Sequence, residues 1–366
     1  MNLKNKRVLI TGANGFIGAR IAARLTQAEN ARVRAMVRTR NVGTRHSPNR
    51  NFFASPVGSS EPSFSDARIL ANASPVPRDE IVIGDIIDAR AIADAIQDCD
   101  IVIHCAAMQG ARGQLRDFRR VNVEGTLNLL RAAKRAGVVR FIHLSTINVH
   151  GYPPPRDCHS DSPLAFTGDF YSISKAEGER AAWKFARAEN FPLVVIRPAC
   201  TYGPRSTAWT LVPLQRVQRG APVLIGTGDG ICNAIYIDNL VDLIIFALTN
   251  DAAIGHAFIG AEGRGVTWRE FYGAYARMLG ITRLNSLPRW FFLLAASGFE
   301  NLARITRTPP RLTRASVEFF SHRVVYDISQ AQKILGYTPR VSFAEGMRLT
   351  EEWLKAEGRV KMTNDK

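Results

Sequence analysis

The strongest constraint on this chain lies at its start, where a short apolar strand pattern leads through a glycine-rich turn into a helical pattern. Residues 7–11 are RVLIT, residues 12–18 are GANGFIG, and the helical pattern covers residues 15–27. Glycines three residues apart permit a tight turn and let backbone N–H groups approach a pyrophosphate at the helix N-terminus. A turn with a purely structural role is the alternative. We favour a dinucleotide site, whose candidate cofactor-binding residues here are Gly12, Asn14, Gly15, Phe16, Ile17 and Gly18.

Strand patterns and helical patterns alternate through the first 200 residues. We predict strands at residues 7–11, 32–37, 80–84, 100–106, 140–146 and 192–198, and helices at 15–27, 89–97, 115–136 and 169–189. Apolar strands separated by helices indicate a parallel sheet covered on both faces. The predicted fold is therefore α/β, a Rossmann-type doubly wound parallel sheet.

Two parts of the chain depart from this alternation. Residues 41–77 are rich in Ser, Pro, Asn and Arg and predict a flexible insertion after the second strand. After Pro198 the strand patterns become short, and helices are predicted at 209–219, 239–248, 268–279 and 344–356. We expect residues 1–200 to form the cofactor-binding domain. Residues 201–366 are expected to form a smaller, mainly helical substrate-binding portion, interleaved with the first.

The chain is strongly basic, with 48 Lys and Arg against 32 Asp and Glu, a formal net charge of +16. A basic surface attracts anions such as dinucleotides and acidic lipids, or is simply solvated. No arginine-rich tail or zinc-ligand spacing favours nucleic acid, so we expect a small-molecule substrate and no nucleic-acid partner. The five cysteines are scattered, which fits a reducing compartment without disulfides or a metal. The first strand follows MNLKNK directly, and we expect a cytoplasmic protein.

The longest apolar run covers residues 290–299. It is too short to span a bilayer, which needs about 20 residues. It predicts either a buried helix or a helix that lies on a membrane surface. Peripheral contact with a membrane therefore remains one of the expected interactions.

Tyr171 and Lys175 stand four residues apart in a predicted helix, which places them on one helix face. The phenol of free tyrosine has a pKa of about 10, and a nearby ammonium stabilises the phenolate and lowers that pKa. Such a pair can exchange a proton with a hydroxyl or carbonyl group, and the lysine can also hold a cofactor ribose. The alternative is a chance pair on a structural helix. The position of Tyr171, 25 residues after Thr146, favours the catalytic interpretation.

Several motifs occur in one order along the chain. After the glycine-rich turn come GDIID at 84–88, HCAA at 104–107, NVEGT at 122–126, STINVHG at 145–151, Tyr171 with Lys175, and RP at 197–198 with YGP at 202–204. In this order they resemble the extended short-chain dehydrogenase/reductase family. The resemblance covers roughly residues 6–355, apart from the expected insertion. Within the family, the C-terminal portion is most similar to the branch that resembles 3β-hydroxysteroid dehydrogenases.

The resemblance implies a role for each matching residue. Tyr171 would be the acid/base, Thr146 would hydrogen-bond the substrate oxygen, and Lys175 would tune Tyr171 and hold the ribose. His150 stands where the family usually has Tyr, and we expect it to have a packing role. The family also implies a homodimer through the helices at 115–136 and 169–189. The further residues expected to line the NAD(P) site are Asp85 and Ile86 near the adenine, Ala106, Ala107, Ser145 and Pro198.

The end of the second strand bears on the choice of cofactor. NAD-selective sites usually place Asp or Glu there to accept from the ribose 2′-hydroxyl. This chain has Arg38 instead, and a guanidinium suits a 2′-phosphate. We therefore predict a preference for NADP, with a solvated Arg38 that accepts NAD as the alternative.

The predicted reaction is hydride transfer between nicotinamide and a hydroxyl or ketone carbon, on an apolar or sterol-like substrate. Sugar-nucleotide dehydratases that resemble this chain carry Asp-Glu after the catalytic Thr, where this chain has Ile147-Asn148. Related epimerases carry an Arg before the segment at 234–240, and that Arg is missing here. A nucleotide-sugar epimerase remains the first alternative. A non-catalytic NAD(P)-binding regulator is the second.

Overall fold

The computed structural model describes residues 1–38, 80–110, 113–306, 310 and 312–360. The insertion expected at residues 41–77 lies outside the described residues. Within the part that is described, none of the helices is long and apolar enough to pass through a bilayer.

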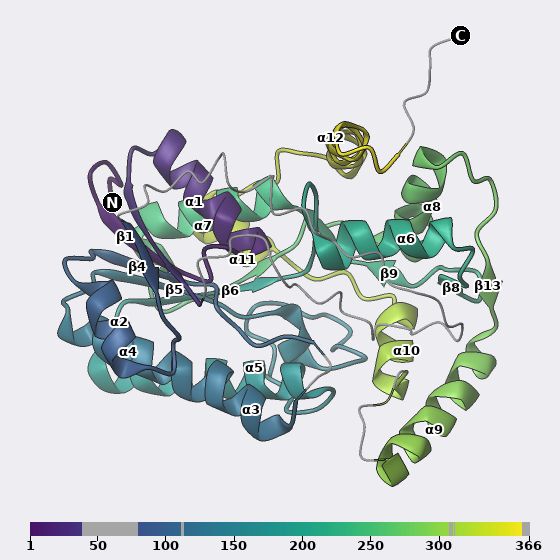
Figure 1. The fold of residues 1–366 in the computed structure, drawn as a ribbon, viewed down its shortest axis with the longest axis horizontal. Helices are drawn as coiled ribbons and strands as arrows, with labels where there is room; N and C mark the ends of the chain where they lie inside the picture. The colour runs from purple at the N-terminus through teal and green to yellow at the C-terminus, as the bar shows by residue number, and fades with distance from the viewer. Residues whose placement is uncertain (39–79, 111–112, 307–309, 311, 361–366) are drawn as a thin grey trace.

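A seven-stranded parallel sheet forms the centre of the molecule, with the order β11-β6-β5-β4-β1-β2-β3 (Figure 1). The order reverses between β1 and β4, and ligands of open α/β sheets bind at such a point. Six strands confirm the predicted ones, and the seventh, β11, comes from beyond residue 200 and was not predicted. The strands are β1 (Arg7–Thr11), β2 (Arg32–Val37), β3 (Ile81–Ile83), β4 (Ile101–His104), β5 (Arg140–Leu144), β6 (Leu193–Pro198) and β11 (Ala257–Gly260).

Helices cover both faces of this sheet (Figure 1). Leu9 points into one apolar cluster, while Val8 and Ile10 point into the other, so both sides of β1 are buried. Burial on both sides explains why the strands are continuously apolar rather than alternating. On one face lie α1 (Phe16–Gln27), α7 (Ile237–Thr249) and α11 (Ser329–Leu335). On the other lie α2 (Ala89–Ile96), α3 (Leu115–Arg119), α4 (Thr126–Arg135) and α5 (Phe170–Glu189).

The helix predicted at 115–136 is interrupted by a π-helical segment, Arg120–Gly125, between α3 and α4. Gly178 of α5 packs against this segment, where an added Cβ would lie 2.4 Å from the Asn122 carbonyl oxygen. A larger residue at 178 would therefore push the two helices apart. This close approach holds α5, which carries Tyr171 and Lys175, against the rest of the layer.

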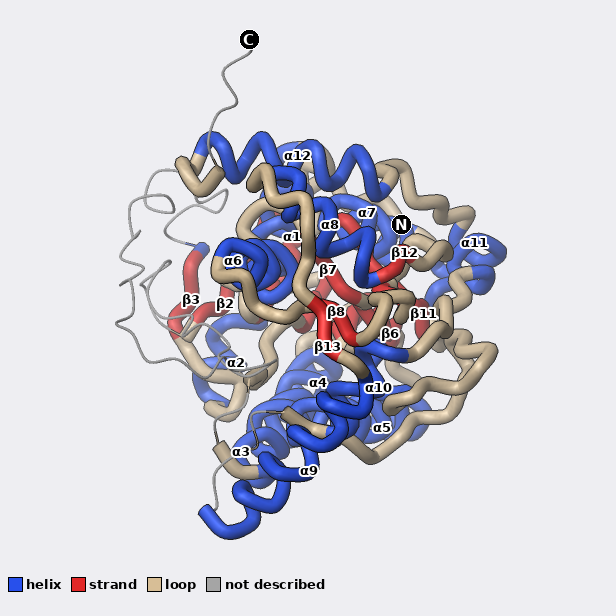
Figure 2. The backbone as a smooth tube through the Cα atoms, turned by 90° about the vertical axis from the view of Figure 1, so that its right-hand side faces the viewer, coloured by secondary structure: helices blue, strands red, loops and turns tan. Residues whose placement is uncertain are grey.

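The C-terminal portion adds short strand pairs and helices at one end of the sheet (Figure 2). The helices predicted at 239–248, 268–279 and 344–356 are confirmed, the one predicted at 209–219 begins in a π-helical segment, Thr207–Leu211, and α10 and α11 were not predicted. The pairs are β7 (Cys200–Tyr202) with β10 (Ala234–Tyr236), β8 (Leu224–Ile225) with β13 (Ser286–Leu287), and β9 (Ile231–Cys232) with β12 (Val266–Thr267). The helices are α6 (Val212–Gln218), α8 (Trp268–Met278), α9 (Arg289–Thr306), α10 (Arg314–Ser321) and α12 (Phe343–Ala356).

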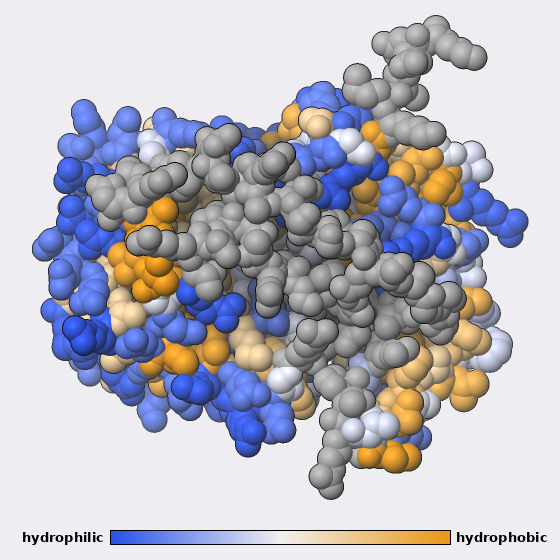
Figure 3. Space-filling view, in the orientation of Figure 1, coloured by the Kyte–Doolittle hydropathy of each residue, from blue (hydrophilic) through white to orange (hydrophobic). Residues whose placement is uncertain are grey.

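Helix α9 contains the apolar run noted in the sequence, and Figures 1 and 2 both place it at the edge of the molecule beside α10. In the space-filling view, apolar atoms gather over the lower right of the surface, where Figure 1 places α9 (Figure 3). The run is thus a helix packed on one side only, and the expectation of a fully buried helix is wrong.

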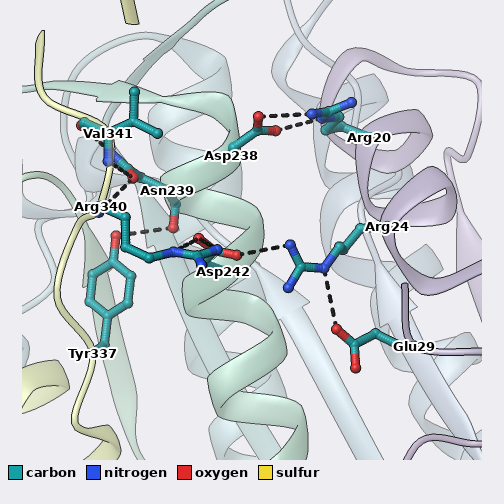
Figure 4. A network of polar contacts seen from close by, with 9 residues as sticks. All are labelled: Arg20, Arg24, Glu29, Asp238, Asn239, Asp242, Tyr337, Arg340 and Val341. Atoms are coloured by element: carbon teal, nitrogen blue, oxygen red, sulfur yellow. Dashed lines mark hydrogen bonds and ion pairs between the residues drawn. The ribbon is translucent and has the colours of Figure 1, made fainter. Parts of the chain in front are cut away.

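An ionic network joins α1 to α7 and to the segment before α12 (Figure 4). Arg20 of α1 forms two hydrogen bonds with Asp238, at 2.5 and 2.8 Å. Asp242, which is 6% exposed, forms ion pairs with Arg24 at 3.4 Å and with Arg340 at 2.5 Å. The network fixes the first helix directly behind the glycine-rich turn, so it also fixes the turn.

Candidate active site

The glycine-rich turn has a backbone that requires glycine at two positions. Gly12 has φ +67°, and a Cβ there would lie 3.0 Å from the Ala106 backbone after β4. A Cβ at Gly18 would lie 2.5 Å from the Gly12 carbonyl oxygen. The turn is therefore pressed against β4 and the start of α1, with space for a phosphate only because side chains are absent. Gly15 caps α1 without a side-chain bond, which leaves first-turn N–H groups for an anion.

The other predicted cofactor residues follow neighbouring strands of the sheet. Because all strands are parallel, their carboxyl ends meet at one edge, and the fold brings these residues to the same edge as the glycine-rich turn. Arg38 is exposed directly after β2, and Asp85 accepts a hydrogen bond from the Ile87 N–H at 3.2 Å in the turn after β3. The remaining residues at this edge are Ile86, Ala106, Ala107, Ser145, Thr146 and Pro198.

Tyr171 lies in the first turn of α5, which begins where Asp169 accepts a hydrogen bond from the Ser172 N–H at 2.7 Å. The phenol is half-buried and forms side-chain hydrogen bonds with Thr146 and Gln109. Desolvation raises the pKa of Tyr171 more than these two hydrogen bonds lower it. The pKa lowering by Lys175 that the sequence led us to expect is not what this structure has. Tyr171 is a protonated phenol at neutral pH.

Lys175 is 2% exposed, and its ammonium donates to the Leu144 carbonyl oxygen at 2.6 Å. The ammonium is engaged by this hydrogen bond, and Lys175 is not among the groups that lower the pKa of Tyr171. Burial lowers the pKa of Lys175 to about 8, although Glu179 and Cys105 raise it. Cys105 follows β4 and lies under Gly12. The electrostatic interaction of Lys175 with Cys105 is consistent with a tyrosine–lysine helix near the turn that would hold the pyrophosphate.

The buried ammonium predicts a specific dependence of stability on pH. The pKa of Lys175 falls from 10.5 to about 8 on folding, so the unfolded chain binds more protons between these values. The free energy of unfolding should therefore rise with pH across this window. The total increase should be about 3 kcal/mol, which is what burial of the charged amine costs at pH 7. Urea unfolding of the wild type and of Lys175→Met at pH 7 to 10 measures this effect. The stability difference between the two should change over this range, and a constant difference would contradict the prediction.

A buried ion pair lies one turn beyond Lys175. Arg197 of β6 meets Glu179 of α5 at 2.5 Å, and the two side chains are 5% and 0% exposed. Burial raises the pKa of Glu179. The charge and hydrogen bonds of Arg197, together with hydrogen bonds to Ser145 and Trp183, lower it by more, so the pKa lies below its usual value. Arg197 also donates to the Ser160 carbonyl oxygen at 2.5 Å. The ion pair therefore joins α5 to β6 of the sheet.

Histidines near the site have structural roles. His104 bridges Thr11 at 2.8 Å and Thr126 at 3.0 Å, and burial lowers its pKa to about 3. His150 is buried beside Arg197, at 3.3 Å, in agreement with its expected packing role. In the described ranges, no cluster of His, Cys, Asp and Glu could hold a metal ion.

Asn122 has a supporting role. Its side chain accepts from the Met108 N–H at 2.7 Å and donates to the Ser174 hydroxyl at 2.9 Å. It thereby fixes Gln109, the residue after Met108, relative to α5. Gln109 was not selected from the sequence, and its position two residues after HCAA was the only available signal.

Tyr152 and Asn148 were also not selected from the sequence as candidate site residues. Tyr152 donates its hydroxyl to Asn148 at 2.7 Å, and Asn148 donates to Ser172 at 3.4 Å. Tyr171 is among the neighbours that raise the pKa of Tyr152, after burial and other groups. Tyr152 also contacts Phe319 and His322, with ring centroids 4.9 and 6.0 Å apart. Tyr152 therefore joins the segment after β5 to aromatic side chains of the C-terminal portion.

A glycine-rich turn at the switch point of a doubly wound sheet, with Tyr, Lys and Thr at the same edge, is the arrangement of a dinucleotide-dependent enzyme with a Rossmann fold. The chain belongs to the NAD dependent epimerase/dehydratase family, whose model matches residues 8–260. It is an NAD(P)-dependent oxidoreductase or epimerase of the extended short-chain dehydrogenase type.

The most similar proteins include different enzymes. A UDP-glucose 4-epimerase of Vibrio cholerae is 26% identical over 97% of both chains. A 2-alkyl-3-oxoalkanoate reductase of Stenotrophomonas maltophilia (strain K279a) is 29% identical over 72% of this chain and 83% of its own. The crystal structure of a UDP-glucuronic acid 4-epimerase from Bacillus cereus in complex with NAD superposes with a TM-score of 0.70 and 21% identity, covering 96% of this chain and 99% of that one.

Proposed function

We propose that the protein reduces or oxidises an apolar substrate at a ketone or hydroxyl carbon, with Tyr171 as proton donor or acceptor. Thr146 orients the substrate oxygen, and Lys175 holds the cofactor ribose. The cofactor residues are those at the carboxyl edge of the sheet, from Gly12 to Pro198. Residues 1–200 would bind the cofactor, and residues 201–366 would provide most of the substrate side.

The observation that carries this proposal is the group of aromatic rings around Tyr152, whose hydroxyl donates to Asn148 in the segment that follows Thr146. Tyr152 and Phe319 lie edge to face, and Trp209 follows with its ring 5.9 Å from that of Phe319. Such rings favour apolar groups over a nucleotide diphosphate. Asn233, in the segment where related epimerases carry an Arg, donates to the Val324 carbonyl oxygen and accepts from the Tyr326 N–H, both at 3.0 Å. Its side chain is therefore used in hydrogen bonds to the backbone of Val324 and Tyr326.

We describe the reaction in the reductive direction, in which Tyr171 acts as the proton donor. When bound, the nicotinamide supplies the hydride that the carbonyl carbon receives. The carbonyl π-electron pair then moves onto oxygen, and the Tyr171 hydroxyl delivers its proton to that oxygen. Tyr171 is protonated at neutral pH even at the ordinary tyrosine pKa of about 10, and burial raises its pKa further. Thr146, within hydrogen-bond reach of Tyr171, would hold the same oxygen. A proton from solvent restores the phenol.

A panel of substrates tests the proposal. The name of the Stenotrophomonas relative describes the reduction of an alkyl-substituted 3-oxo acid, so the panel should include 2-alkyl-3-oxoalkanoates and 3-oxosteroids. We expect loss of NADPH absorbance with one of these ketones. The similarity to the Vibrio epimerase over 97% of both chains favours the second candidate, a nucleotide-sugar epimerase. Interconversion of UDP-glucose and UDP-galactose without net cofactor consumption would support that alternative.

The NADP preference rests on Arg38, which is exposed directly after β2, where a ribose 2′-phosphate would lie. We expect Arg38→Ala to weaken NADPH binding by about tenfold or more, since a charge-assisted bond to phosphate is lost, and to leave NADH binding little changed. Fluorescence titration of both cofactors measures this. Arg32→Ala, exposed at the other end of the same strand, is the matched control. Equal binding of the two cofactors before and after the change would exclude the preference.

We further propose a cytoplasmic homodimer through α3, α4 and α5, the layer that the π-helical segment joins. These helices lie on one face of the sheet (Figure 1). Light scattering measures the oligomeric state.

A further inference from the structure

Helix α9 exposes large apolar side chains to an unusual degree. Trp290 is 65% exposed, Leu294 67% and Ile305 81%, and Phe291 and Leu302 are 42% and 53% exposed. With about 3.6 residues per turn, these five positions fall within an arc of about 120° of the helix surface. They lie on one face of the helix in two groups, 290–294 and 302–305, with Gly298 and Asn301 between them, and we call this face the α9 stripe. Scattered exposed apolar residues are ordinary, whereas several large ones on one helix face mark a contact surface.

The opposite side of α9 is firmly packed. Phe292 and Ala296 are 6% and 0% exposed, and they form a small core with Leu312 and with Val317 of α10. This core is separate from the two that cover the sheet. The helix is therefore held in place by its inner face, and the α9 stripe faces outward because of that packing.

The charge around the stripe indicates what it contacts. Residues 281–324 contain seven Arg and two Glu, with no Lys or Asp, in a chain of net charge +16. Arg289 and Arg314 line a groove between α9 and α10 together with Leu294, a member of the stripe. Their side chains are 49% and 68% exposed and pair with Glu318 and Glu300, so the charge of the segment beyond these pairs comes from its other arginines. Guanidinium groups thus lie at the border of the apolar surface.

A second copy of the chain would bring the same positive charge to this surface, and the two would repel each other. A bilayer with anionic lipids would instead attract the arginines and accept the apolar side chains at the boundary of headgroups and acyl chains. An amphipathic surface helix with aromatic residues among its apolar ones is suited to this position. The helix is not long and apolar enough to cross the bilayer, so contact would be at the surface.

We propose that α9 docks the protein on the surface of membranes that contain anionic lipids, with the α9 stripe inserted and the neighbouring arginines near the lipid phosphates. The site described above does not depend on this contact. An apolar substrate dissolved in the bilayer would, however, be close to the enzyme.

Sedimentation of the full chain with vesicles tests the proposal. We expect binding to vesicles of phosphatidylcholine with phosphatidylglycerol, weaker binding to phosphatidylcholine alone, and a decline with added salt. The double variant Leu294→Glu/Ile305→Glu should bind at least about tenfold more weakly, because two inserted side chains become charged. Val139→Glu is the control, since Val139 is an exposed apolar residue, 49% accessible, in another part of the fold.

Turnover of a water-soluble ketone should be equal in the wild type and the double variant, which separates this proposal from the proposed function. Equal vesicle binding by the wild type and the double variant would overturn the docking role. The proposal would also be overturned if light scattering showed that the wild type is a dimer that the double variant cannot form, with no binding to vesicles.

Discussion

Tyr171→Phe is expected to lower kcat by about 10²- to 10⁴-fold while cofactor affinity and thermal stability stay near their wild-type values. The change removes only the phenolic oxygen, which hydrogen-bonds Thr146 and Gln109 and is the candidate proton donor. The ring keeps its place in the first turn of α5. The measurements are steady-state turnover of the substrate that the panel identifies, titration of NADPH fluorescence, and thermal unfolding.

The chain offers a matched control for this experiment. Tyr152 interacts electrostatically with Tyr171 and donates to Asn148 at 2.7 Å, so Tyr152→Phe removes the same atom from another tyrosine. We expect Tyr152→Phe to retain turnover within about tenfold, because its hydroxyl orients a side chain and does not donate the proton. If Tyr171→Phe kept the full rate, or if both variants lost rate equally, Tyr171 would not be the acid.

Arg197→Met is expected to lower the free energy of unfolding by about 3–5 kcal/mol. Arg197 and Glu179 meet at 2.5 Å with almost no exposure, so the change would leave a carboxylate buried without its counter-charge. Urea unfolding at pH 7 measures the loss. Glu179→Leu/Arg197→Met should regain most of it, since two apolar side chains replace both charges.

The pH dependence of this variant follows from the pKa of Glu179, which the fold lowers below its usual 4.5. A lowered carboxyl pKa contributes stability above the unfolded value, and this contribution is lost as pH falls through the folded pKa. In Arg197→Met the lone buried carboxyl has a raised pKa and protonates as pH falls toward 4.5, and the wild-type pair loses its contribution below 4.5, so the deficit should shrink as pH falls. Arg348→Met, which breaks a pair on the surface of α12, should change stability little at any pH. A similar loss in both variants would show that burial of the pair is unimportant.

The local patterns of the chain were sufficient for much of the fold. Six strands of the sheet and most of the longer helices follow from their periods of apolar residues, because burial on one or both faces leaves a regular pattern in the chain. The seventh strand, β11, was missed because it lies beyond Pro198, where the alternation of strand and helix patterns weakens. Helix α10 lies in the same part of the chain and was also missed, although it positions Phe319 beside Tyr152.

The candidate site was predictable wherever its geometry is local. Glycine spacing identifies the turn because φ +67° at Gly12 and the contact of its backbone with Ala106 tolerate no side chain. The spacing of four places Tyr171 and Lys175 on one face of α5. Gln109 and Tyr152 were missed because they reach Tyr171 from other segments, and no spacing along the chain relates them to it.

The amino-acid sequence alone predicts the doubly wound sheet, the position of the glycine-rich turn and the tyrosine–lysine pair, since each depends on residues near one another along the chain. Contacts between distant segments set the electrostatic state of that pair, in which the ammonium donates to the Leu144 carbonyl oxygen and burial raises the pKa of the phenol. They also determine that one face of α9 packs while the other is exposed. Desolvation and packing depend on which distant segments meet, and a local pattern does not specify those contacts.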